Sequence, residues 1–212
     1  MNLIWITLKQ WNQLLLERGV THTSEEPDTP AVLLSSRLEE SNPDIDLQHS
    51  YRLARLSGSS PEQKSFLFKM LQNLISTRER LHRTGKAPNP CCTFCNFHED
   101  TPEHFLSCPQ SLKVATPLLA SLASLTENLT HKDITLLNIH TPESWELPAV
   151  WLLSTCLMFI WDNRVAGKSA KLDECRAELL ARVALLKETK WKHYSLHNSA
   201  LLLSEAINLH FV

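Results

Sequence analysis

Hydrophobic and polar residues alternate with a helical period along most of the chain. Residues 3–18 place leucines and tryptophans near helical spacing and predict an amphipathic helix. Similar patterns predict helices over about 47–56, 110–127, 144–167, 170–191 and 196–210. No alternating pattern long enough for a strand is found. The predicted fold class is therefore mainly α.

The strongest helical pattern is "SSPEQKSFLFKMLQNLISTRERLHRTG", which begins at residue 59 and is predicted as one helix. Ser60 is a good N-cap, Pro61 suits the first helical position, and Gln63 completes a capping box. Gly85 is predicted to end the helix, because glycine favours the residue after a helix C-terminus. Two prolines then lead into a cysteine cluster.

Composition divides the chain into four predicted regions. Residues 21–50 carry one basic and seven acidic residues, whereas residues 51–90 carry eight basic and two acidic residues. The formal net charge of the whole chain is only −2, so the uneven distribution of charge along the chain is more informative than the total charge. The regions are an N-terminal amphipathic helix (1–20), an acidic proline-containing linker (21–46), a basic helix plus zinc knuckle (47–110) and a helical C-terminal region (111–212).

Four of the six cysteines lie within residues 91–108. Cys92 and Cys95 form C-x2-C, a turn that can direct two thiolates at one ion. His104 and Cys108 lie four apart, after a Thr-Pro pair that predicts a helix start, so one helix face can present both. Three sulfurs and one imidazole suit Zn²⁺.

These four ligands would fill a tetrahedral site and leave no position for water, which predicts a structural zinc rather than a catalytic one. Cys91 could replace Cys92, and His98 could replace His104. We prefer Cys92 because C-x2-C is the commoner spacing, and His104 because its helix also presents Cys108. The predicted fold is a helical domain with a small Cys3His zinc knuckle between helices.

The stretch "CTFCNFHEDTPEHFLSCP" resembles the zinc-binding domain that follows the reverse transcriptase in non-LTR (LINE-type) retrotransposon proteins. That family runs Cys-x2-Cys, an acidic stretch, Glu-Thr-x-x-His, an aromatic-leucine pair and Cys-Pro. The helix before the knuckle is also similar, as is the tail "ESWELPAVWLLSTCLMFIWDNR" with its tryptophan and arginine near the end. Clear similarity covers about 60–110, and weaker similarity reaches about 166.

Two features depart from that family. Three residues separate His104 from Cys108, where the family often has four. The paired aspartates of the polymerase active site are absent, so reverse-transcriptase activity is not carried over. The chain also has only four glycines and shows no phosphate loop, nucleophile elbow or acid–base pair. We therefore expect no catalytic residues and no small-molecule substrate.

A basic segment directly precedes the knuckle, and two aromatic residues lie inside it. Arginine and lysine can bind phosphates, and exposed aromatic rings can stack on unpaired bases. The candidate nucleic-acid-binding residues are Arg78, Arg80, Arg83, Lys86, Phe94 and Phe97. The competing interpretation is a solvated basic face with both phenylalanines packed inward.

The sequence predicts an intracellular protein, nuclear or cytoplasmic, because its first residues lack the basic start of a secretory signal. The most apolar stretch (148–161) is shorter than a membrane span and predicts a buried core helix. We expect a non-catalytic, zinc-stabilised module derived from the C-terminal part of a retrotransposon reverse transcriptase. Its expected partners are RNA or DNA and protein segments of the parent element. The alternative is a zinc-stapled interaction or structural domain that binds no nucleic acid.

Overall fold

The computed structural model describes residues 45–56, 60–123, 129–188 and 194–211. Within these ranges the regular elements are helices, and an isolated antiparallel bridge joins Cys91 to Glu99. The mainly α fold class is confirmed. The predicted N-terminal helix (1–20) and nearly all of the acidic linker (21–46) lie outside the described residues.

The described helices match most of the predicted ones to within a few residues. They are α3 (Leu47–Ala54), α4 (Pro61–Leu71), α5 (Arg78–Arg83), α6 (Pro102–Ser107), α7 (Pro109–Ala123), α8 (His131–Thr135), α9 (Glu143–Val165), α10 (Leu172–Glu188) and α11 (Tyr194–His210). The short α8 was not predicted from the sequence. Its N-cap is Thr130, which forms a capping box with Asp133.

Helix α9 forms the centre of the core. Helices α3, α4, α7, α10 and α11 all pack against it, so its buried residues face every side. Leu153, Cys156 and Leu157 are fully buried, which confirms the predicted core helix. Among the described helices, α9 alone has the length and apolar composition to cross a membrane, but most of it is buried within the fold.

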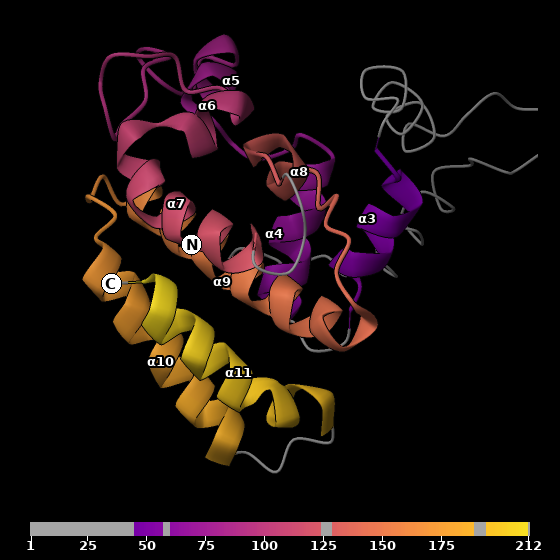
Figure 1. Ribbon diagram of the computed structural model, residues 1–212. Coiled ribbons are helices and arrows are strands. Elements are labelled where there is room, and N and C mark those ends of the chain that lie inside the picture. Colours follow the sequence, from indigo (N-terminus) through magenta and orange to yellow (C-terminus); the bar gives the residue numbers. More distant parts are fainter. Residues whose placement is uncertain (1–44, 57–59, 124–128, 189–193, 212) are drawn as a thin grey trace, which may run out of the picture. The chain divides into compact units, whose positions relative to one another are not determined.

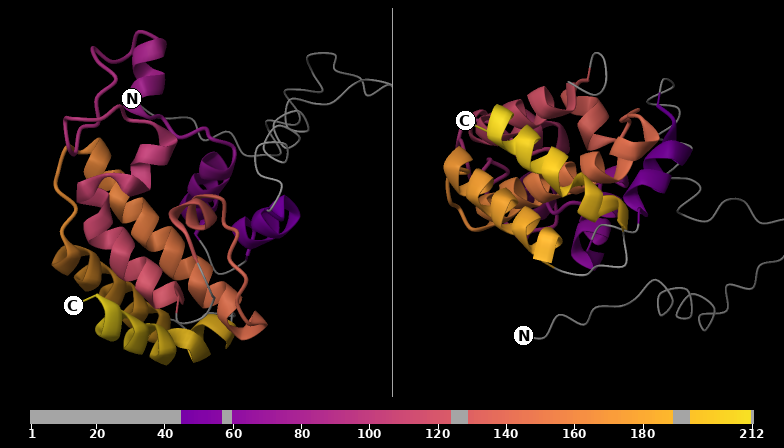
Figure 2. Two further views of the ribbon diagram at one scale, coloured as in Figure 1. Left: turned by 45° about the horizontal axis from the view of Figure 1, so that its top comes forward. Right: turned by 60° about the horizontal axis from the view of Figure 1, so that its bottom comes forward.

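Two helix pairs, α10–α11 and α5–α6, lie at different places around α9. Helices α10 and α11 lie side by side and cover α9 and α7 from one side, as Figures 1 and 2 show. Helices α5 and α6 lie at the opposite end of the molecule, with the cysteine-containing loops beside them. The cysteine-containing segment is therefore at one end of the helical core.

The helix predicted from residue 60 to Gly85 is wrong as one continuous element, because the chain forms α4 and α5 separately. Helix α4 ends at Leu71, and Asn73 takes a left-handed conformation with φ of 52°. Thr77 then caps α5 by accepting the N–H of Arg80. Asparagine tolerates the left-handed region and threonine is a good N-cap, so these local preferences divide the predicted helix into two.

The predicted helix stop at Gly85 is confirmed. Gly85 has φ of +70°, its N–H donates to the His82 carbonyl at 2.9 Å, and the next N–H, from Lys86, donates to the Leu81 carbonyl at 2.7 Å. This left-handed residue turns the chain out of α5, because glycine has no Cβ to oppose that conformation. The chain then runs to the cysteines.

Candidate metal centre

The turn from Cys92 to His98 brings the sulfurs of Cys92 and Cys95 close together. Cys92 and His98 are linked by the backbone N–H of Cys92, which donates to the His98 carbonyl at 2.8 Å. The N–H of Asn96 donates to the Cys92 carbonyl at 2.8 Å, and Asn96 itself is left-handed with φ of 58°. The N–H of Phe94 points at the Cys92 sulfur at 3.4 Å. These bonds close a tight turn whose backbone donors face the thiols.

Of the other two candidate ligands, His104 lies within α6 and Cys108 is its C-cap. Thr101 caps α6 by accepting the N–H of His104 at 3.2 Å, and Pro102 occupies the first turn, as predicted. Cys108 ends α6, and its carbonyl accepts the Leu112 N–H of α7 at 2.9 Å. Cys108 therefore stands at the junction of two helices, one of which also carries His104.

The structure brings the four preferred ligands together. One ligand atom from each of Cys92, Cys95, His104 and Cys108 lies within 4.8 Å of the others. The sulfurs of Cys92 and Cys108 are 3.8 Å apart, and the Cys95 sulfur is 3.4 Å from Nε2 of His104. A tetrahedral zinc with usual bond lengths separates two sulfurs by about 3.8 Å and a sulfur from a nitrogen by about 3.6 Å. These residues could therefore bind a metal such as zinc.

The two alternative ligands lie outside this group. Cys91 is half-buried and pairs through its backbone with Glu99. His98 is exposed, with Nδ1 3.9 Å from the Cys95 sulfur and its ring 5.2 Å from the His104 ring. His98 therefore lies next to Cys95 and His104, but the group of four ligand atoms within 4.8 Å of one another contains His104.

The thiols of Cys95 and Cys108 have opposite pKa shifts. Burial raises the pKa of Cys108 to about 11, and the neighbouring Cys92 adds to this rise, although the backbone N–H groups of Gln110 and Ser111 act against it. Burial also acts to raise the pKa of Cys95, but hydrogen bonds outweigh it and lower the pKa to about 5. The donors are the backbone N–H groups of Phe97 and His98 and the imidazoles of His98 and His104.

The donor set fits a metal cation for two reasons. Cys92 and Cys108 are buried with their sulfurs close together, and a cation between them would offset the repulsion of two thiolates. The backbone N–H groups that face the sulfurs of Cys95 and Cys108 are the outer contacts that thiolate ligands favour. Three sulfurs and one imidazole are ligands typical of zinc.

Asp100 and Arg164 form a buried ion pair next to the candidate metal centre. Burial lowers the pKa of Arg164, while the charges of Cys92 and Cys95 act to raise it. The sequence showed Asp100 only as part of an acidic stretch and Arg164 only as part of the similar tail. The sequence feature that could have indicated the role of Arg164 is its position as a single arginine near the end of a long apolar helix.

The four basic candidate residues lie on or just after α5 and differ in their contacts. The backbone N–H of Arg78 donates to Asp100, and the Arg80 guanidinium donates to the Asn73 carbonyl at 3.0 Å. Arg83 pairs with Glu79 one turn away at 3.0 Å and its side chain is 70% exposed. Lys86 is exposed beyond the end of α5. Arg83 and Lys86 therefore have the greatest freedom to meet a ligand.

The two phenylalanines of the knuckle lie in different environments. Phe94 is half-buried and packs against the hydrophobic core, with the Arg164 guanidinium 5.9 Å from its ring centroid. Phe97 is 88% exposed, between Cys95 and His98. The inward-packed interpretation thus describes Phe94, whereas Phe97 is free to contact a partner.

No family model, curated protein or solved structure matches the chain in the three comparisons with known proteins.

Proposed function

We propose that the chain is a non-catalytic nucleic-acid-binding module that one structural Zn²⁺ stabilises. It is of the kind that follows the reverse transcriptase in non-LTR retrotransposon proteins. The zinc would be held by Cys92, Cys95, His104 and Cys108. RNA or DNA would contact the cations of α5 and the exposed Phe97.

The observation that carries this proposal is the attachment of α5 to the metal-binding segment. The N–H of Arg78 donates to Oδ2 of Asp100 at 2.8 Å, and the N–H of Glu79 points to the Asp100 carbonyl at 3.4 Å. Asp100 directly precedes the cap of α6, which carries His104. A metal that orders α6 would therefore also order the start of α5 and its cations. Fixed cations are favourable for phosphate binding, because less side-chain and backbone freedom is lost on association.

The exposed ring of Phe97 adds a second contact type. Among the described residues Phe97 is the most exposed large apolar side chain, so its ring is accessible to a partner. An exposed aromatic ring suits single-stranded nucleic acid, where each stacked base contributes about 1–3 kcal/mol. Phosphate contacts from α5 and base stacking on Phe97 would together give sequence-tolerant binding.

The test is fluorescence anisotropy of the zinc-loaded chain with labelled single-stranded RNA and DNA across a salt series. The logarithm of the affinity should fall with the logarithm of salt concentration, with a slope of about 0.7 per phosphate contact. Arg83→Gln combined with Lys86→Gln should weaken binding and reduce the slope by about 1.4. Phe97→Ala should weaken binding about fivefold or more with little change in slope.

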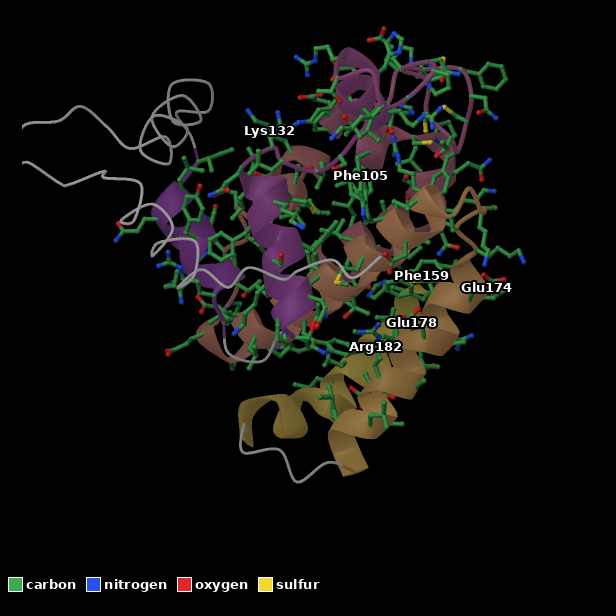
Figure 3. The ribbon with its side chains drawn as sticks, turned by 180° about the vertical axis from the view of Figure 1, so that it is seen from behind. Phe105, Lys132, Phe159, Glu174, Glu178 and Arg182 are labelled. Atoms are coloured by element: carbon green, nitrogen blue, oxygen red, sulfur yellow. The ribbon has the colours of Figure 1, made fainter. Side chains whose placement is uncertain are left out.

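A matched control removes one arginine from a similar ion pair elsewhere. Arg182 pairs with Glu178 four residues earlier on α10, as Arg83 pairs with Glu79 on α5. Figure 3 shows Glu178 and Arg182 far from Phe105 and from the end where the sulfur atoms gather. Arg182→Gln should leave binding unchanged. Absence of binding at low salt by a folded, zinc-loaded chain would contradict the nucleic-acid function and favour the zinc-stapled interaction domain.

A further inference from the structure

Arg164 is a buried cation in the last turn of α9, and no cysteine or histidine ligand lies on that helix. Its side chain is 2% exposed. It forms an ion pair with Asp100, whose side chain is 3% exposed and whose second oxygen accepts the N–H of Arg78. Burying an arginine is unfavourable unless anionic or hydrogen-bond-accepting groups surround it.

Contacts from both ligand-bearing segments converge on Arg164. Its guanidinium carbon lies 5.9 Å from the ring centroid of Phe94, which stands between Cys92 and Cys95 in the sequence. It lies 5.6 Å from the ring centroid of Phe105, which follows His104. The hydroxyl of Thr93 donates to the Arg164 carbonyl at 3.0 Å. The Cys92–Cys95 turn and α6 are thus both fixed to the end of α9 through one residue.

The Arg164 guanidinium has donor capacity beyond Asp100. Its Nε and Nη1 atoms are buried without a hydrogen-bond partner among the described residues. Besides Asp100, the sulfurs of Cys92 and Cys95 act on the guanidinium, because their charges favour the protonated arginine. A zinc with three thiolates and one neutral imidazole carries a formal charge of −1, so thiolate sulfurs would accept these N–H groups and match the positive charge.

We propose that Arg164 is a positioning residue of the metal centre, which anchors both ligand-bearing segments to α9 and donates to the thiolates of the bound metal. Arg164 would thereby tighten zinc binding and slow zinc release. The inference rests on the zinc site of the proposed function and is independent of nucleic-acid binding. Outer contacts of this kind are worth about 10–100-fold in metal affinity.

The experiment measures zinc affinity and release rate of the full chain by competition with a chromophoric chelator. Arg164→Met removes the cation, and Arg164→Met with Asp100→Asn also removes the carboxylate that would be left unpaired. The double variant should recover helical content by circular dichroism, yet bind zinc at least about tenfold more weakly and release it faster. Arg164→Lys keeps the charge but lacks the planar guanidinium. Its zinc affinity should lie between that of the wild type and that of the double variant.

Cobalt substitution separates positioning from ligand loss. The variants should retain the sulfur-to-cobalt charge-transfer bands of a three-thiolate site, whereas Cys95→Ser should reduce them. Arg182→Met, on α10, is the control and should leave zinc affinity unchanged. Wild-type zinc affinity and release rate in the folded double variant would overturn the proposal. A wild-type chain that binds no zinc would overturn both this proposal and the zinc site itself. Absence of RNA binding alone would contradict only the nucleic-acid function and not the role of Arg164.

Discussion

Two adjacent cysteines, Cys91 and Cys92, have different positions relative to the candidate metal centre. Cys92 is buried with its sulfur facing Cys108, while Cys91 is half-buried and outside the cluster. The chain is extended here and bridges to Glu99, so consecutive side chains point to opposite faces. Backbone alternation thus separates the two cysteines, in agreement with the preference for Cys92 that the C-x2-C spacing gave.

This difference gives a prediction at the scale of single residues. Cys95→Ser should abolish stoichiometric zinc binding, because it leaves three ligands. Zinc content can be measured by atomic emission after gel filtration. The matched control is Cys91→Ser, which should retain one zinc per chain. Equal zinc content in the two variants would remove Cys95 from the site.

The sequence predicted which four residues come together at the candidate metal centre, because these residues are close in sequence. Cys92, Cys95, His104 and Cys108 lie within seventeen positions, and their spacing already limits the geometry. The Asp100–Arg164 pair joins residues 64 positions apart, so it depends on the docking of α9. Local preferences do not encode such a long-range contact, and only the tertiary structure reveals it.

At the scale of elements, the start of α4 combines a local and a long-range role. Ser60 and Gln63 form the predicted capping box, and the Gln63 amide also donates to buried Thr155 of α9 at 2.9 Å. The N-terminus of α4 is thereby fixed to the central helix. The sequence predicted the cap, whereas the contact with α9 required the fold.

Ser60→Ala should lower the free energy of unfolding by about 1 kcal/mol, because the Gln63 N–H loses its capping oxygen. Urea denaturation followed by circular dichroism measures this change. Ser76→Ala, at an exposed position between α4 and α5, should change stability by less than about 0.5 kcal/mol. Equal effects would mean that the capping box does not stabilise α4.

The ion pair between Arg52 of α3 and Glu146 of α9 makes the docking of α3 depend on pH. The hydrogen bond from Arg52 lowers the pKa of Glu146 below its ordinary value of 4.5. A lowered folded-state pKa stabilises the protein above pH 4.5, and this contribution is lost as the pH falls through the folded-state pKa.

Glu146→Gln should therefore destabilise the protein near neutral pH, and the difference from wild type should shrink below about pH 4.5. The effect should be on the order of 0.5 kcal/mol, because Arg52 is half-exposed. Denaturation midpoints across pH measure it. Arg52→Gln should reproduce the loss, and the double variant should lose little more than either. A difference independent of pH would exclude the ion pair as its cause.

At the scale of the whole molecule, the candidate metal centre is continuous with the helical core. Phe105 and Leu106 of α6 are fully buried members of that core, and Phe105 contacts Trp161 of α9 edge to face at 5.8 Å. Metal binding should therefore stabilise the described domain rather than one loop.

A chelator should lower the thermal midpoint of the whole helical signal. Zinc at a hundredfold excess over its dissociation constant should stabilise the folded chain by about 2.7 kcal/mol. Circular dichroism melts with and without chelator measure this effect, and added zinc should restore the midpoint. In the Cys95→Ser variant the chelator should have no effect. An unchanged wild-type midpoint would show that zinc does not stabilise the domain.

The central position of α9 has a consequence for truncated forms of the chain. Helices α10 and α11 follow α9 in sequence and cover one side of it and of α7. A premature stop codon after Val165 would leave that side of α9 without its cover. The shortened product would expose an apolar helix and be prone to aggregation or to capture by chaperones. Frameshifts between α9 and α10 should have the same effect, because they also remove the helices that cover this side of α9.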